Sequence, residues 1–200
     1  MKWKITGFAL LILMLAGASL AHAEAAQEWE IDKAHTSIYF DVKHTYATVR
    51  GQFGNFTGTL RFNPENKEAS GLDIRVHAAS INTNIAKRDN HLRSEDFFDV
   101  EKYPYITFNS TGVRHVEDNS YVITGLLTLK DVTRRIEVPV TFFGIQDNPM
   151  EKGQTVAGFE AEFTIDRMDY NVGTGRFLEM GVVGRKVNIV VTMEALKDSK

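Results

Sequence analysis

Side chains able to do chemistry gather in one stretch of the chain, AKRDNHLRSEDFFDV, which runs from residue 86 to residue 100. It brings three cations, four carboxylates and His91 together within fifteen residues, with Phe97 and Phe98 near its end. Such a mixture of residues is compatible with a catalytic cluster, a metal site, a solvated loop or the mouth of a binding site. The choice between them depends on what the rest of the chain offers.

A metal site has little support from the sequence. No two histidines are spaced as in HxH or HExxH, and the chain has no cysteine, so zinc and copper lack their usual ligand patterns. Only a pair of histidines brought together from distant parts of the chain would change this expectation. We therefore expect no metal and no cofactor, and surface or hydrogen-bonded roles for the histidines that follow residue 23: His35, His44, His77, His91 and His115.

Enzyme motifs are absent as well. The chain has no GxSxG elbow, no Walker loop and no dinucleotide-binding fingerprint. The run 173–175, Gly-Thr-Gly, is expected to be a flexible turn. Asp166 and Asp169 flank Arg167, which favours a solvated ion pair over an acid–base dyad. No catalytic residue is predicted, and the protein is not expected to be an enzyme.

The N-terminus reads as a targeting segment. Lys2 and Lys4 precede an apolar run over 5–15, and the small-x-small triplet 21–23 follows. This run is shorter than the roughly 20 residues that span a bilayer. We expect residues 1–23 to be a secretory signal peptide cleaved after Ala23. Residues 24–200 then form one domain.

Charge and cysteine content narrow the class of partners. Loss of Lys2 and Lys4 takes the formal net charge from −3 to −5, and without a basic run this argues against nucleic acid as a partner. An exported chain without cysteine must rely on its core rather than on disulfides. This combination favours a bacterial periplasm.

Period-two alternation of apolar and polar residues dominates the chain and predicts β-strands with one buried face. Short polar turns separate them, so neighbouring strands are expected to be antiparallel. Their apolar faces must meet in a sandwich or a closed barrel. Several strands run about ten residues, roughly 33 Å, which favours the barrel. The eight predicted strands cover 38–42, 56–62, 72–78, 105–113, 121–129, 136–142, 159–165 and 187–193.

An eight-stranded barrel either fills with its own side chains or holds one slim ligand, and alternation leaves both outcomes open. The inward residues predicted to line the lumen, and to contact a ligand there, are Phe40, Val42, Phe56, Leu60, Phe62, Ile74, Val76, Ile106, Phe108, Ile136, Val138, Phe142, Phe159, Phe163 and Ile165.

The charged stretch lies in a connection of about 24 residues between the predicted strands, and connections of that length usually carry structure or function. Asp89 or Asn90 can cap a short helix that continues to Phe97 or Phe98.

Two interpretations of this connection remain open. In the favoured one it is a plug at the end of the barrel, where apolar side chains close the core and the charges are solvated. In the other it is a site for the polar head of a lipid, formed at the mouth of the lumen by Arg88, His91 and Arg93.

Several motifs occur in a fixed order: WxID at 29–32, HTxIxF at 35–40, RDxHLRSxDFF at 88–98 and YPxIxFxS at 103–110. The last two together are highly specific. On these motifs the chain resembles the YceI-like family of polyisoprenoid-binding proteins over essentially all of residues 24–200. It departs from the usual family pattern at 131–133, Asp-Val-Thr, and at 166–171, DRMDYN.

The resemblance implies an all-β fold: an extended antiparallel eight-stranded lipocalin-like β-barrel, with the short helix near 88–98. It implies a long isoprenoid or acyl chain in the lumen, a periplasmic or secreted location, frequent homodimers and a link to isoprenoid quinones. A transient contact with the membrane or with a membrane redox protein is also expected. The function expected is that of a non-enzymatic carrier. The alternatives are a barrel enzyme acting on a lipid or quinone, and a ligandless barrel serving as a stress or interaction protein.

Overall fold

The computed structural model of the protein describes residues 26–198, which form one antiparallel sheet of eleven strands. The segment interpreted as a signal peptide lies outside the described residues. The strands are β1 (Gln27–Ile31), β2 (Ser37–His44), β3 (Ala47–Phe53), β4 (Phe56–Phe62), β5 (Gly71–His77), β6 (Ile81–Asn82), β7 (Tyr105–Glu117), β8 (Ser120–Leu129), β9 (Val132–Asp147), β10 (Gln154–Asp166) and β11 (Val183–Asp198).

The sheet closes on itself because β1 pairs with β4 on one side and with β11 on the other. Six of the strands are halves of three long ones, broken at 32–36 between β1 and β2, at 54–55 between β3 and β4, and at 78–80 between β5 and β6. With these joined, eight long strands make a closed barrel. The predicted all-β, eight-stranded lipocalin-like fold is confirmed.

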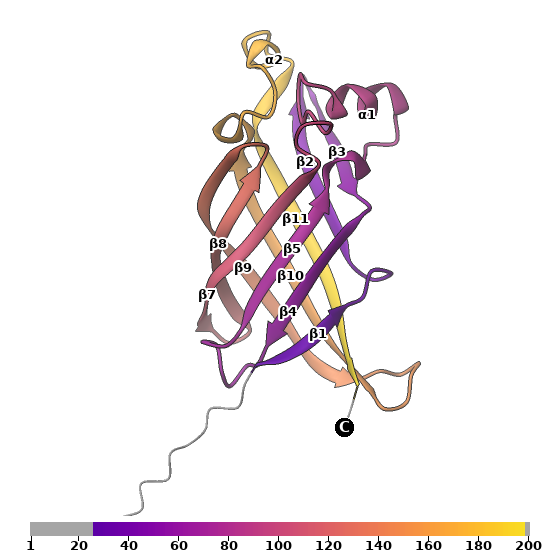
Figure 1. Cartoon of the computed structure of the whole chain (residues 1–200), viewed down its shortest axis with the longest axis vertical. Coiled ribbons are helices and arrows are strands. Elements are labelled where there is room, and N and C mark those ends of the chain that lie inside the picture. Colours follow the sequence, from indigo (N-terminus) through magenta and orange to yellow (C-terminus); the bar gives the residue numbers. More distant parts are fainter. Residues whose placement is uncertain (1–25, 199–200) are drawn as a thin grey trace, which may run out of the picture.

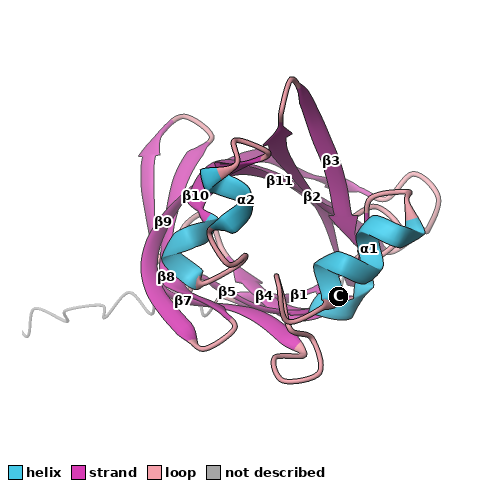
Figure 2. Ribbon diagram, turned by 90° about the horizontal axis from the view of Figure 1, so that it is seen from above, coloured by secondary structure: helices cyan, strands magenta, loops and turns pink. Residues whose placement is uncertain are grey.

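The two ends of the barrel differ in their connections (Figure 1). The lower end carries the tight turns 63–70, 118–119 and 148–153. The upper end carries two helix-containing connections: one holds α1 (Ala86–Arg93), and the other holds the 3₁₀ helix η2 (Arg167–Tyr170) and α2 (Arg176–Glu179). A further 3₁₀ turn, η1 (Ala78–Ser80), lies at the break between β5 and β6. Seen from above, α1 and α2 lie over the barrel rim from different sides (Figure 2).

The predicted helix in the long connection is present, but it starts and ends several residues earlier than expected. It ends at Arg93 instead of continuing to Phe97, and its N-cap is Ile85, which makes no side-chain cap. Asp89 is buried and accepts hydrogen bonds from the backbone N–H and the hydroxyl of Thr83, at 2.8 and 2.5 Å. The expectation that Asp89 or Asn90 caps the helix is therefore wrong, because Asp89 fastens α1 to the chain before it. Within residues 26–198, no helix has the length and apolar character needed to cross a membrane.

The lower half of the barrel is packed with aromatic side chains. The ring of Phe62 lies 4.8 Å from that of Phe142, 5.1 Å from that of Phe159 and 5.6 Å from that of Tyr121, between ring centroids. The indole N–H of Trp29 donates to the carbonyl of Phe62 at 3.0 Å. Rings from four strands thus meet across the lumen and form a floor, which we call the aromatic floor: Phe62, Tyr121, Phe142 and Phe159.

Candidate functional site: an apolar cavity in the upper half of the barrel

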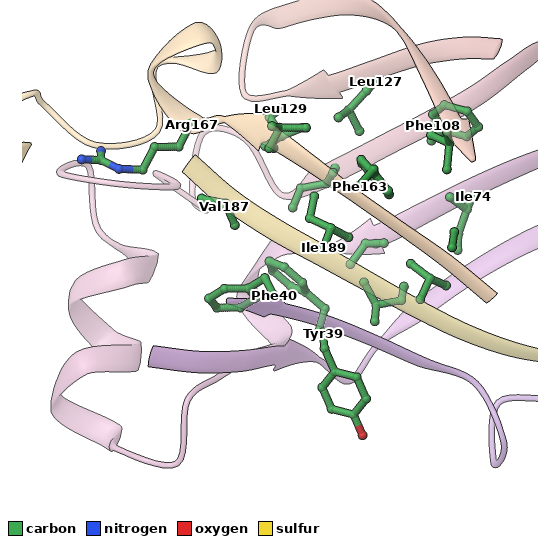
Figure 3. A pocket seen from close by; sticks show the side chains of 18 of the residues that line it. Tyr39, Phe40, Ile74, Phe108, Leu127, Leu129, Phe163, Arg167, Val187 and Ile189 are labelled. Carbon is green, nitrogen blue, oxygen red and sulfur yellow. The ribbon is translucent and has the colours of Figure 1, made fainter. Parts of the chain in front are cut away.

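Above the aromatic floor the barrel encloses a cavity of about 220 Å³ (Figure 3). Its wall is built from side chains of β2, β3, β5 and of β7 through β11, which are almost all aliphatic or aromatic. Among the described residues that line it, Arg167 is the one with a charged side chain. A smaller pocket of about 60 Å³ continues toward the floor and shares part of this wall, including Leu72, Val140 and Ala161.

The residues predicted to line the lumen fall into three groups. Nine line the cavity: Phe40, Val42, Ile74, Val76, Ile106, Phe108, Val138, Phe163 and Ile165. Three line the smaller pocket below it: Leu60, Phe62 and Phe159. The other three line neither space and pack into the wall or the floor instead: Phe56, Ile136 and Phe142.

Two glycines explain why the upper half stays hollow although it contains phenylalanines. A Cβ atom added to Gly51 would stand 2.3 Å from Cζ of Phe40, and one added to Gly125 would stand 2.4 Å from Cζ of Phe108. Each ring therefore lies over a glycine on a neighbouring strand. This arrangement lays the rings along the wall instead of across the lumen.

The connection that carries α1 covers the cavity from above. Leu92, Phe97 and Phe98 line it, and Phe98 meets Phe53 edge to face at 5.8 Å between ring centroids. Phe97 stacks on Phe177, within α2, at 5.5 Å between ring centroids. The two upper connections are thus joined by aromatic contacts directly over the cavity.

The two arginines predicted as head-group candidates bind the backbone of the plug. Arg88 donates from Nε to the hydroxyl of Thr83 at 2.7 Å and from Nη2 to the carbonyl of Thr83 at 2.8 Å. Arg93 donates from Nε to the carbonyl of Ala79 and from Nη2 to that of Ile81, both at 2.8 Å. Neither side chain lines the cavity.

His91, the third candidate, lies outside the cavity as well. Its Nε2 is 2.9 Å from a carboxylate oxygen of Asp96, and its ring meets the edges of Phe97 and Phe177 at 5.1 and 5.5 Å between centroids. The structure therefore places all three candidates in the framework that holds the plug, which agrees with the favoured interpretation of this connection.

Arg167 is a charged residue of the cavity lining that the sequence did not predict to lie there. It is 4% exposed, and its guanidinium donates to the carbonyls of Gly184, Val172 and Val183 at 2.7, 2.7 and 3.2 Å. The expected solvated ion pair with Asp166 is wrong, because no ion pair of the described residues includes Arg167.

The neighbours of Arg167 show how the site is built. Asp166 pairs instead with Arg185, at 2.9 Å. Burial lowers the pKa of Arg167 from its ordinary value, although a guanidinium stays charged in proteins. A Cβ atom on Gly173 would stand 2.2 Å from Nη1 of Arg167, and Gly173 has φ +92°. The first residue of the Gly-Thr-Gly run, which is expected to be a flexible turn, therefore packs its backbone on this arginine.

The charge of Arg167 is directed away from the cavity. Figure 3 shows its guanidinium beyond the apolar side chains and pointing away from them, so that its aliphatic stem faces the space. The wall presented to a ligand is thus apolar, and the arginine acts by joining η2, the 172–173 turn and the start of β11. The sequence carries a weak signal, because Arg167 lies in the stretch 166–171 that departs from the usual family pattern, and two glycines follow at 173 and 175.

Outside the cavity, a cluster of three side chains could hold a cation. Asp32, His35 and Glu194 meet on the outside of the barrel, at the break between β1 and β2, with their ligating atoms within 4.8 Å of one another. Nδ1 of His35 is 2.7 Å from Oδ2 of Asp32. That hydrogen bond raises the pKa of His35 and lowers the pKa of Asp32. The third ligand comes from the far end of the chain, so spacing in the sequence could not reveal the cluster.

The fold and the cavity define a lipocalin-like barrel, hollow above and packed below. The chain belongs to the YceI-like domain family, whose model matches residues 29–195. It is 36% identical over 189 residues to the UPF0312 protein ECA1782 of Pectobacterium atrosepticum, covering 93% of each chain.

Solved structures share the fold. BcnA of Burkholderia cenocepacia superposes with a TM-score of 0.74 at 25% identity, over 83% of this chain and 99% of BcnA. A polyisoprenoid binding domain from Saccharophagus degradans superposes with a TM-score of 0.61 at 14% identity, over 88% of this chain and 99% of that domain. The predicted family is confirmed.

Proposed function

We propose that the protein is a non-enzymatic carrier that binds the aliphatic chain of an isoprenoid or isoprenoid-quinone lipid in the upper cavity. The observation that carries the proposal is the cavity itself: a space of about 220 Å³ with an apolar wall, under a plug at one end of a closed barrel. The name of the Saccharophagus degradans domain, a polyisoprenoid binding domain of the same fold, supports this choice of ligand.

Affinity for such a chain comes from burial alone. Each buried methylene contributes roughly 0.8 kcal/mol, so an isoprene unit contributes about 3–4 kcal/mol before the cost of immobilisation. An apolar cavity of about 150 Å³ accepts benzene. By that measure the upper cavity and the pocket below it hold about two isoprene units. A longer chain must extend through the upper end or displace the aromatic floor.

The two alternatives fit the geometry less well. An enzyme acting on the lipid needs an acid, a base or a nucleophile facing the cavity. Among the described residues that line it, the candidates are Arg167, whose donors point to backbone carbonyls, and Tyr39, whose hydroxyl points away from the other lining side chains (Figure 3). A ligandless barrel needs a lumen filled by its own side chains. The lower half meets that requirement, and the upper half does not.

Lipid extraction and native mass spectrometry of protein purified from its own host test the proposal. We expect a bound lipid with a branched, unsaturated chain, and uptake of short prenols by protein stripped of ligand. Recovery of only ligand-free protein, together with failure to take up prenols or quinones, would refute it.

The site of action is part of the proposal. A signal peptide at 1–23 and a periplasmic location fit a carrier that meets lipids outside the cytoplasm. The homodimer and the contact with a membrane or a membrane redox protein stay predictions.

A further inference from the structure

The upper rim of the barrel carries two exposed side chains with apolar character next to the cavity. Tyr46, at the turn between β2 and β3, is 98% exposed, and Met180, directly after α2, is 63% exposed. The backbone N–H of Thr45 donates to the carbonyl of Val182 at 2.9 Å, which brings the two segments together. Val183, the next residue, lines the cavity. The two exposed side chains therefore flank its upper end.

Cations surround these two side chains. Lys43 precedes the turn and lies against Gly184, where an added Cβ atom would be 3.3 Å from its own Cβ. Acidic groups on the same segments include Glu179, Asp166 and Asp41, of which Asp166 is paired with Arg185 and Asp41 with Arg50. We call this surface the rim patch, and its exposed members are Lys43, Tyr46, Arg176, Met180, Arg185 and Lys186.

The lower end of the barrel has the opposite charge. Met150, in the turn between β9 and β10, is 89% exposed, so exposed apolar side chains occur at both ends. The lower turns and the strand residues beside them, however, hold six carboxylates against two cations: Glu65, Glu68, Glu117, Asp118, Asp147 and Glu151 against Lys67 and Lys152. An anionic surface would attract the rim patch and repel the lower end.

We propose that the rim patch docks the barrel, upper end first, on an anionic lipid bilayer. Aromatic and apolar side chains insert at the boundary of head groups and acyl chains, while lysine and arginine bind the anionic head groups beside them. The inference rests on the proposed function. A docked barrel receives a lipid chain from the bilayer beside the cavity, without exposing that chain to water, where each methylene is unfavourable.

Vesicle co-sedimentation tests the docking. The purified protein is mixed with vesicles of phosphatidylcholine alone or with about 30 mol% phosphatidylglycerol, which supplies the anionic surface. We expect binding to the anionic vesicles that weakens as salt is added, since exposed charges are screened. The double variant Tyr46→Ser with Met180→Ser should bind at least about tenfold less. Met150→Ser, the matched change at the acidic end, should bind as the wild type does.

Lysine variants and a second assay complete the test. Lys43→Gln with Lys186→Gln should remove the preference for anionic vesicles. If the wild type binds neither kind of vesicle, the docking proposal is overturned, and a protein is then the candidate partner of this surface. An equal loss in Met150→Ser also overturns it.

The proposed function is tested separately, by uptake of a short prenol from dilute ethanol solution. The rim variants should take up the prenol as the wild type does, because they leave the cavity wall unchanged. If the wild type takes up none, the carrier proposal fails whatever the vesicles show.

Discussion

In the lower half of the barrel four aromatic rings from four strands meet across the lumen, whereas in the upper half the rings of Phe40 and Phe108 lie along the wall over glycines. Both halves show the same alternation of inward apolar residues. What separates them is the size of the inward side chain at each level and the presence of a glycine beside it. Packing below gives stability, and the space above is available to a ligand.

The largest effect that would sharpen this contrast is on stability. Phe142→Ala removes a ring from the aromatic floor and should lower the free energy of unfolding by about 3–5 kcal/mol, as cavity-forming phenylalanine substitutions do. Urea unfolding measures it. Phe143→Ala is the matched control, because Phe143 lies next in the same strand and is 64% exposed; it should change stability by less than about 0.5 kcal/mol. Equal losses in the two variants would contradict a packed floor.

A second effect concerns the upper half. Arg167→Met should destabilise the protein by about 1–3 kcal/mol, because the carbonyls of Val172, Val183 and Gly184 lose their donors. Hydrogen exchange should speed up in 167–184 and stay unchanged at the aromatic floor. Arg185→Met, which removes only a surface ion pair, is the control and should cost less than about 1 kcal/mol. A uniform rise in exchange over the barrel would show that the two halves are one cooperative unit.

Filling the cavity should separate binding from stability. Ala161→Phe places a ring in the upper space, which at about 220 Å³ exceeds the 150 Å³ or so that accepts benzene. We expect prenol uptake to fall at least tenfold, equal to about 1.4 kcal/mol, with little change in the urea midpoint. Thr164→Phe, on the outer face of the same strand, should leave uptake unchanged. Full uptake by Ala161→Phe would place the ligand elsewhere.

The smallest effect is a pH dependence of the β2–β3 hairpin, which β11 supports on one side and only the short β6 on the other. Two hydrogen bonds from Arg50, at 2.8 and 2.7 Å, hold the pKa of Asp41 below its ordinary value. Because the pKa of Asp41 is lower in the folded protein than in the unfolded chain, the ion pair stabilises the fold at pH values above the unfolded pKa of about 3.9. This stabilisation is lost as pH falls through the folded pKa. Arg50→Gln should therefore be slightly less stable than the wild type near pH 7, since an exposed ion pair contributes little. The difference should disappear near pH 2, and a constant difference would exclude this coupling.

Alternation predicted the eight strands because one face of each is buried. It did not predict β1, β3 or β6. In β3 the inward position between Val49 and Phe53 is Gly51, which carries no apolar side chain and breaks the pattern. The same absence of a side chain lets Phe40 lie along the wall. Glycine adds no signal to a hydrophobic pattern, yet here it helps to determine whether the lumen is open.

The candidate site was harder to predict than the fold. A strong local cluster of charge drew attention to Arg88 and Arg93, yet three of their five hydrogen bonds go to backbone carbonyls of the segment before them. Arg167 is flanked by carboxylates in sequence, yet it binds carbonyls up to seventeen residues away. The residues next to these arginines in the sequence therefore did not indicate their partners. Backbone carbonyls occur in every residue, so no sequence pattern identifies the ones that accept a hydrogen bond.

The place of β11 in the barrel has a consequence for folding. This last strand pairs with β10, with β2 and with β1, so the ring cannot close until the end of the chain is available. Contacts between the first and last strands are the most distant in sequence, and such contacts form slowly. A chain still being synthesised therefore remains an open sheet with an exposed apolar face, and the barrel closes only in its final step.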